Sequence, residues 1–307
     1  MFILIIVACI WGTSFLLAKD LIAVVGANTG AFPRVFWGAF ICLIIAAISE
    51  KWVFDKKKIA KAFIYGPLSI GLPFYFLFKG LVYVPSSMGA LLNGLMPTFA
   101  IVMVVLKGRK INMPLAIMGN LIAIAGVFIL VGDVNSFSKL VIGKELFLGI
   151  TFLMLMNICY AAGNAFYDEL HPKLPMFQSL FWILFSSSLC LFLLDGANLK
   201  MLTLIHSKTI NAVVLGVVNT AIAFKLYYYI IEKHGAIMAS QAPLIAPFAA
   251  TTVSLAFGEI TFSYSYMLAL LFIVTAIKFS QMALRAKPTR FFKRFRIKVL
   301  RFISLIF

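Results

Sequence analysis

The sequence predicts an all-α membrane protein with ten transmembrane helices in two inverted five-helix repeats. The first observation is composition: 63% of the 307 residues are hydrophobic and only 12% are charged. A soluble domain is about half apolar and about a quarter charged. This apolar excess needs a bilayer as its solvent, in which helices satisfy their own backbone hydrogen bonds. The other two observations are an internal repeat and a biased distribution of basic residues.

The internal repeat relates residues 85–109 to residues 235–259 at an offset of 150 positions without a gap. Both copies are long apolar stretches with a proline near the middle, and Pro97 aligns with Pro247. Self-similarity at a fixed offset indicates a repeat architecture. In membrane proteins, paired segments of this kind are typical of carriers made of two equivalent halves with a binding site between them.

Ten apolar stretches are each long enough, at about 20 residues, to cross the hydrocarbon of a bilayer. In order, they are residues 2–19, 28–49, 62–80, 85–106, 113–132, 146–167, 175–194, 209–231, 235–257 and 263–284. The first five spans form the repeat at residues 1–133, and the last five form the repeat at residues 145–284. Because each half has an odd number of spans, the second half is expected to be inverted relative to the first.

The basic residues predict the orientation. Most of the 27 Lys and Arg residues lie in the even-numbered loops and in the tail at residues 285–307. Since basic loops stay on the cytoplasmic side, we expect a multi-pass protein of the cell inner membrane with both termini cytoplasmic. The net charge of +17 is then a topology signal rather than a sign of nucleic-acid binding.

The tail interleaves Phe, Ile and Leu with Arg and Lys over residues 289–307. This pattern predicts a basic amphipathic segment that lies on the anionic lipids of the inner leaflet. A disordered basic tail is the alternative, although it would leave many aromatic side chains in water.

Several short patterns are shared with a known family. They are Trp11-Gly12-Thr13-Ser14-Phe15 in the first span, Arg34 early in the second, the proline-broken fourth and ninth spans, and Phe257-Gly258-Glu259 after the ninth. These residues resemble the EamA family of the drug/metabolite transporter superfamily, and the resemblance covers residues 1–284. It implies a ten-helix alternating-access carrier of metabolites, with a central cavity lined by spans 1, 3, 4, 6, 8 and 9. One departure is Lys107-Gly108-Arg109, where the family usually has Leu-Gly-Glu.

Charged groups inside spans are candidates for function, because burying charge in a bilayer is unfavourable. Lys225 lies about 9 Å inside the eighth span at 1.5 Å per residue, beside Tyr228 and other aromatic residues. We expect these two residues to contact the solute, with Lys225 binding an anionic group; for Lys225 the alternative is snorkelling to the inner surface. Arg34 is favoured as a helix-packing or interfacial anchor, and Lys278 as a snorkelling residue. No Asp or Glu lies deep in a span, which argues against a buried carboxylate proton relay.

Two amides lie upstream of the repeated prolines. Asn93 precedes Pro97, and Gln241 precedes Pro247. A proline in the middle of a helix removes a backbone hydrogen bond and frees a carbonyl. Carriers use such groups to form binding sites and hinges at the bilayer midplane. We therefore expect Asn93 and Gln241 to bind the solute and the two prolines to act as hinges, with interhelical hydrogen bonding as the alternative for the amides.

Four further residues on spans 1 and 6 complete the predicted binding site. Ser14 and Asn164 offer polar groups, for which hydrogen bonding between helices is the alternative. Trp11 and Tyr160 are expected either at the mouth of the cavity or in the interfacial aromatic belt. The expected partners are thus a small solute and membrane lipid, with no nucleic acid.

We expect no catalytic site, no metal site and no cofactor. His171, His206 and His234 lie in loops without metal-ligand spacing, and no nucleophile motif or phosphate-binding loop occurs. The sequence therefore predicts a secondary, non-ATP transporter of small polar metabolites, such as amino acids or organic anions. The alternatives are a membrane-embedded enzyme, which would need buried acidic or histidine clusters, and a membrane-embedded non-transporting interaction protein, which would need no paired broken helices.

Overall fold

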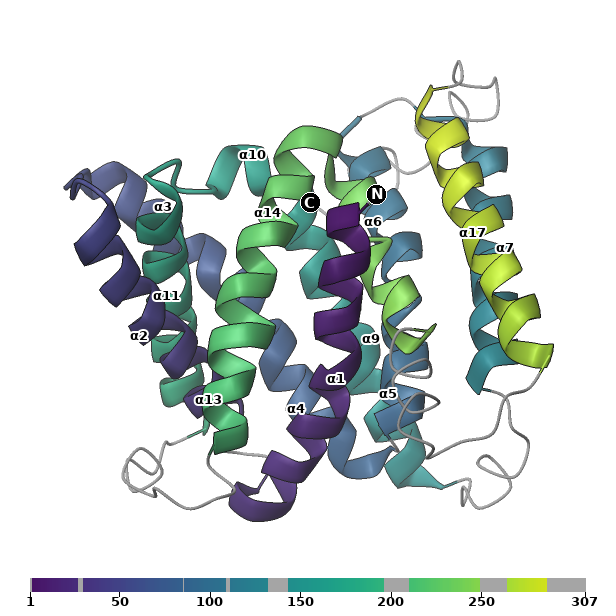
Figure 1. Cartoon of the computed structure of the whole chain (residues 1–307), viewed down its shortest axis with the longest axis horizontal. Coiled ribbons are helices and arrows are strands. Elements are labelled where there is room, and N and C mark those ends of the chain that lie inside the picture. The colour runs from purple at the N-terminus through teal and green to yellow at the C-terminus, as the bar shows by residue number, and fades with distance from the viewer. Residues whose placement is uncertain are drawn as a thin grey trace, which may run out of the picture.

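The structure, a computed structural model, describes residues 2–26, 30–84, 86–108, 111–131, 143–195, 210–248 and 264–285. These residues form a bundle of helices without strands (Figure 1). The N-terminal half contains α1 (Phe2–Val25), α2 (Ala31–Ser49), α3 (Lys56–Gly66), η1 (Pro67–Gly71), α4 (Leu72–Tyr83), α5 (Ser86–Asn93), α6 (Met96–Leu106) and α7 (Met113–Val131). The C-terminal half contains α9 (Lys144–Ala165), α10 (Tyr167–Leu170), α11 (Met176–Asp195), α13 (Ile210–Gly216), η2 (Val217–Ile222), α14 (Ala223–His234), α15 (Ala236–Ala239) and α17 (Tyr264–Arg285). The expected amphipathic tail beyond Arg285 and the family-like Glu259 lie outside the described residues.

Six helices in the described part of the chain are long and apolar enough to cross a membrane. They correspond to spans 1, 2, 3, 6, 7 and 8: Phe2–Val25, Ala31–Ser49, Lys56–Tyr83, Lys144–Ala165, Met176–Leu194 and Ile210–His234. Three shorter apolar helices are Met113–Gly126, Ala236–Phe248 and Met267–Phe279. Large apolar side chains such as Ile48 (82% exposed) and Leu193 (73% exposed) cover the outer surface, as contact with lipid requires. The chain is a multi-pass membrane protein.

The expected fourth span is broken into two helices. Helix α5 ends at Asn93 and α6 begins at Met96, with a turn at Gly94 and Leu95. Pro97 occupies the first turn of α6, where the missing N–H is tolerated, and its ring excludes a continuous helix through the residues before it. The break therefore precedes Pro97 by about one turn.

A similar break occurs in the C-terminal half. Helix α15 ends at Ala239, a turn follows at Ser240 and Gln241, and residues 242–248 are helical again. Pro243 stands in the first turn after this break, whereas Pro247 lies further along the same helix. The break in this half therefore lies nearer to Pro243 than to Pro247, and the hinge expected at Pro247 stays a prediction.

The helices pair across the two halves. Helix α2 packs against α11, α7 against α17, α4 against α9, and α1 against α13 and α14. In Figure 1, α2 and α11 lie on the left, α7 and α17 on the right, and α1 and α14 in front. Glu50, which follows α2, connects this helix to α11. Its carboxylate accepts hydrogen bonds from the backbone N–H groups of Phe177 (2.9 Å) and Gln178 (3.0 Å) in the first turn of α11. A carboxylate is stabilised at this position by the unpaired N–H groups and the helix dipole.

Each half contains one π-helix among its described residues, and the two begin 150 positions apart, at Pro67 and Val217. A glycine precedes each of them. Gly66 lies against the backbone of Ile183 in α11, and Gly216 lies against the backbone of Arg34 in α2. Small residues allow helix backbones to approach closely in membranes, so these glycines set the distance between the helices of opposite halves.

Basic side chains gather at one end of the bundle. In Figure 1, α3, α10, the end of α14 and the N-terminus lie at the upper end. Helix α3 begins with three consecutive lysines, and Asp55 caps it by accepting hydrogen bonds from the N–H groups of Lys57 (3.0 Å) and Lys58 (3.2 Å). Lys233 lies in the last turn of α14. The upper end of the bundle is therefore the basic end.

Candidate functional site

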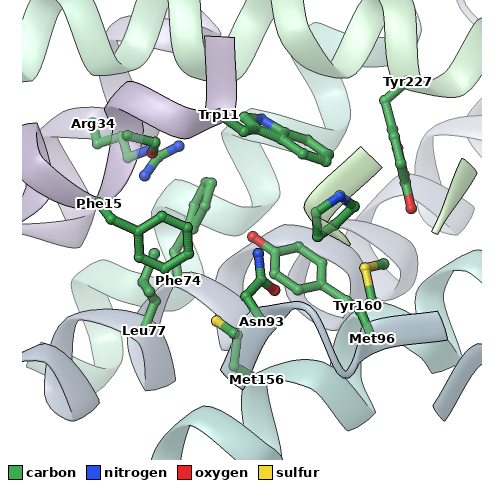
Figure 2. A pocket seen from close by; sticks show the side chains of 12 residues that line it. Trp11, Phe15, Arg34, Phe74, Leu77, Asn93, Met96, Met156, Tyr160 and Tyr227 are labelled. Atoms are coloured by element: carbon green, nitrogen blue, oxygen red, sulfur yellow. The ribbon is translucent and has the colours of Figure 1, made fainter. Parts of the chain in front are cut away.

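A cavity lies between the two halves, near the middle of the bundle. Its volume is about 30 Å³, which is close to the share of one molecule in liquid water. The N-terminal half lines it with Trp11, Ser14, Phe15, Arg34, Phe74, Leu77, Asn93 and Met96, and the C-terminal half with Met156, Tyr160, Tyr227 and Pro243. Figure 2 shows these side chains converging from both sides. The cavity in this structure is small.

Trp11 is held by the π-helix of the C-terminal half. Its indole Nε1–H donates to the backbone carbonyl of Asn219 in η2 at 3.1 Å. The ring packs against Tyr227 (centroids 4.9 Å apart) and Phe224 (5.6 Å). The side chain of Asn219 in turn donates to Thr13 Oγ1 at 3.0 Å. The sequence left Trp11 either at the cavity or in the interfacial aromatic belt. In the structure its side chain lines the cavity.

Arg34 is the only charged residue among those that line the cavity, and it is 1% exposed. Its Nε–H donates to Thr220 Oγ1 at 2.9 Å, and its Nη2 donates to the Asn219 carbonyl at 3.3 Å. The guanidinium carbon lies 3.9 Å from the centroid of the Phe74 ring. Nη1 has no hydrogen-bond partner among the described residues. Sequence reasoning favoured an anchoring role for Arg34, although its depth in a span is the signal that could have placed it in the site.

Three other residues expected from the sequence also line the cavity: Ser14, Asn93 and Tyr160. Asn93 is the last residue of α5 before the break, and it is 7% exposed. Its Oδ1 has no hydrogen-bond partner among the described residues. The Tyr160 ring packs edge-on against Phe74, with centroids 6.3 Å apart. The cavity therefore offers one unpaired donor group, on Arg34, and one unpaired acceptor, on Asn93.

Lys225 lies outside the cavity. Its half-buried side chain reaches Phe177 of α11, with Nζ 4.6 Å from the ring centroid. Gln241 is buried at the second helix break, where its Nε2 donates to the Ile237 carbonyl at 3.2 Å, and it does not line the cavity either. The structure therefore gives these two residues no contact with the space in which the solute was expected.

Tyr228 belongs to an aromatic cluster behind the cavity. Its ring lies 6.1 Å from Tyr65, 5.4 Å from Tyr167 and 5.4 Å from His171, centroid to centroid. His171 follows α10, outside the spanning helices. Burial and, to a lesser extent, the nearby Lys173 together lower the pKa of its imidazole to about 3. The cluster is therefore uncharged at neutral pH.

A second, wider space lies beside the first. It has a volume of about 290 Å³ and is lined by the ends of α6, α9 and α14 together with α10 and the start of α15. We call it the vestibule. Asn164 lines the vestibule, and its Nδ2 donates to the hydroxyl of Tyr227, which lines the cavity, at 2.6 Å. This buried hydrogen bond stands between the two spaces.

Lys107 links helices at the rim of the vestibule. It is the first residue of Lys107-Gly108-Arg109, which stands where Leu-Gly-Glu was expected. Its Nζ forms an ion pair with Glu169 at 2.7 Å and donates to the backbone carbonyl of Ala165. These bonds join the end of α6 to the end of α9 and to α10. A second bond at the rim links the hydroxyl of Tyr167 to the carboxylate of Glu232 at 2.8 Å. Arg109, the other basic residue of this pattern, lies outside the described residues.

The described residues contain no group of three or more His, Cys, Asp or Glu side chains that could hold a metal ion. The cavity lining itself has one cationic group, one amide, hydroxyl groups and a majority of apolar side chains. This mixture is typical of a small-molecule site, in which a few polar groups fix the orientation of a ligand on apolar walls.

Residues 1–132 match the family of EamA-like transporters, part of the drug/metabolite transporter superfamily. One solved structure, titled "Crystal structure of protein", is similar to this chain with a TM-score of 0.71 and 16% sequence identity. The similarity covers 92% of this chain and 96% of that chain. No curated protein sequence matches this chain. The sequence match to EamA-like transporters thus lies in residues 1–132, and it points to a membrane transporter of the drug/metabolite type.

Proposed function

We propose that this protein is a secondary, alternating-access transporter of small polar metabolites such as amino acids or organic anions. The observation that carries the proposal is the small cavity between the two halves, lined by both of them and bearing Arg34 and Asn93. A cavity of about 30 Å³ is too small for such a solute. The proposal therefore treats this structure as an occluded state, which has to widen when the solute enters.

Two inverted halves with ten spans are part of the proposal. The π-helices and their preceding glycines repeat at an offset of 150 positions, and each glycine faces the opposite half. The pairing of α4 with α9 has its counterpart in the pairing of α14 with α1. Both relations are what a two-fold axis in the membrane plane would produce. We accordingly assign residues 1–133 and 145–284 to the two repeats.

We also propose that the basic end of the bundle faces the cytoplasm of a cell inner membrane. Lysines at the start of α3 and the end of α14 lie there, and basic loops are retained on that side. Both termini are then cytoplasmic. Anionic lipids on that side would attract the basic tail that follows Arg285 in the sequence. On this assignment the vestibule opens toward the cytoplasm.

Transport by wild-type protein in proteoliposomes is the first test. We would offer labelled amino acids and organic acids, with and without a proton gradient, and measure uptake and counterflow. Replacing Ser14 by leucine is expected to reduce transport at least about tenfold, because the added carbons fill a cavity that has room for about one water molecule. Ser49→Leu places the same change at an exposed position near the end of α2 and is expected to transport normally. Absence of transport by the wild type for every solute would contradict the proposal.

The hydrogen bond between Asn164 and Tyr227 is expected to close the cavity toward the vestibule. Tyr227→Phe removes this bond, and a net loss of about 1 kcal/mol corresponds to opening that is about fivefold more frequent. The measurement is the rate at which a membrane-impermeant thiol reagent, applied at the basic end, labels Met156→Cys in the cavity. The background for this experiment lacks the native cysteines Cys9, Cys42, Cys159 and Cys190.

Tyr229→Phe is the matched control, because Tyr229 is two residues away and exposed on the outer surface. It is expected to leave the labelling rate unchanged. Equal rates for Tyr227→Phe and the background protein would show that this hydrogen bond does not control access to the cavity.

A further inference from the structure

The guanidinium of Arg34 is a buried charge without a counter-ion in the part of the chain that the structure describes. Among the described residues, the ion pair that occurs is Lys107–Glu169 at the rim of the vestibule. Arg34 is bound instead by a hydroxyl, a carbonyl and an aromatic face. A buried charge that lacks an opposite charge is strongly unfavourable, and in membrane spans such residues mark the paths of solutes and ions.

The same three contacts fix the direction of the guanidinium. Thr220 and the Asn219 carbonyl hold Nε and Nη2, and the Phe74 ring covers one face of the guanidinium plane. Nη1 is left as the unpartnered nitrogen. Figure 2 shows the guanidinium directed toward the space beside Trp11 and Phe15. An N–H group prepared in this way binds an anion without further ordering of the side chain.

We propose that Arg34 is the residue that selects the solute, by binding a carboxylate through Nη1, and that Asn93 Oδ1 accepts a hydrogen bond from a donor group on the same molecule. This inference rests on the proposed transport function and deepens it. The substrate class is a small carboxylate whose remaining surface is uncharged, because the other walls of the cavity are apolar or aromatic. A carboxylate oxygen accepts a short, charge-assisted hydrogen bond from such a guanidinium N–H group.

Asn93 adds a second point of recognition. It is buried at the break between α5 and α6, with an unpartnered acceptor oxygen. A solute N–H or O–H group would satisfy this oxygen, whereas an apolar solute would leave it unpaired. A solute whose donor group binds Asn93 and whose carboxylate binds Arg34 is held in a defined orientation across the cavity.

The test compares solutes that differ only in charge. Purified full-length protein would be given lactate and glycolate, and their uncharged amide counterparts lactamide and glycolamide. Binding is measured as ligand-dependent thermal stabilisation in detergent, and transport as counterflow in proteoliposomes. We expect binding and exchange for the carboxylates and at least about tenfold weaker binding for the amides, since a hydrogen bond to a charged group contributes about 1.5–3 kcal/mol.

Three variants test which residue binds the carboxylate of the solute. Arg34→Ala is expected to weaken carboxylate binding about 100-fold, and Arg34→Lys about tenfold, because lysine keeps the charge and loses the fork of N–H groups. Lys225→Ala removes another intramembrane cation, one that contacts Phe177 outside the cavity, and is expected to bind as the wild type does. The comparison of carboxylate with amide needs no variant, so it stands even if Arg34→Ala fails to fold.

Equal binding of amides and carboxylates by the wild type, or unchanged carboxylate affinity in Arg34→Ala, would overturn the inference and leave the transport function intact. Stabilisation by chloride or phosphate that depends on Arg34, with none by the carboxylates, would also overturn it, because an inorganic anion would then be the occupant. Carboxylate binding that depends on Arg34 in a protein that transports no solute would support the inference and contradict the transport function.

Discussion

Replacing Gly66 or Gly216 by alanine is expected to lower the thermal stability of the protein more than any other single methyl group added to it. A Cβ at Gly216 would lie 2.6 Å from the Arg34 carbonyl oxygen and 2.8 Å from the Gly38 nitrogen. A Cβ at Gly66 would contact the Ile183 carbonyl oxygen and Ser186 Oγ at still shorter distances. These neighbours are mostly backbone atoms, so the helices have to separate. Overpacking of this kind costs about 1–3 kcal/mol, which corresponds to roughly 5 °C in the unfolding midpoint.

Gly143→Ala is the matched control for this prediction. Gly143 precedes α9 in extended backbone (φ −156°), and no atom lies within 4 Å of the position of an added Cβ. Its replacement is expected to leave the midpoint unchanged when all three variants are heated in the same detergent. A Gly66 or Gly216 variant as stable as Gly143→Ala would show that the close approach between the halves is not rigid.

The second large effect is expected at Trp11. Trp11→Ala removes the hydrogen bond to the Asn219 carbonyl and the ring contacts with Tyr227 and Phe224. Truncation of a packed tryptophan costs about 3 kcal/mol or more. It also enlarges a cavity that has room for about one water molecule. We therefore expect a protein that is less stable and that accepts larger solutes, measured by thermal unfolding and by competition in the transport assay.

Two variants separate these consequences. Trp11→Phe keeps an aromatic ring but loses the indole N–H, so it is expected to recover part of the stability. Trp52→Ala removes an exposed tryptophan whose ring lies 6.0 Å from Phe181 at the surface, and it is expected to leave solute selectivity unchanged. If Trp11→Ala and Trp52→Ala destabilise equally and transport the same solutes, Trp11 belongs to the aromatic belt rather than to the cavity.

Sequence reasoning identified the polar and aromatic residues of the cavity better than its charged residue. Trp11, Ser14, Asn93 and Tyr160 were expected, and all four line the cavity. Their positions follow from composition and from the broken helix at Asn93, which are local features. The six long apolar spans are local features as well, and they were predicted from hydrophobicity alone.

The choice between Arg34 and Lys225 could not be made from local features. Which side of a helix faces the cavity changes by roughly 100° for each residue, and Lys225 is only two positions from Tyr227, which does line the cavity. The role of Arg34 depends on Thr220 and Asn219, which lie more than 180 positions away in the chain. These contacts exist only once the two halves have packed together.

The π-helix η2 makes the reading of the eighth span from sequence harder still. A π-helix has i→i+5 hydrogen bonds and so accommodates an extra residue without lengthening the helix in proportion. Residues before Val217 and after Ile222 therefore do not share the helical periodicity that a continuous α-helix would give them. The same holds on either side of Pro67–Gly71 in the third span. In each half, the helical periodicity of the side chains is therefore shifted at the equivalent position of the span. Deleting one residue there would turn the π-helix into a regular α-helical turn and leave the later side chains, including Tyr227, facing as they do now. Deleting one residue from the α-helical part of the span before Val217 would instead turn every later side chain by about a quarter of a revolution, and would carry Tyr227 away from the cavity while leaving the hydrophobicity of the span unchanged.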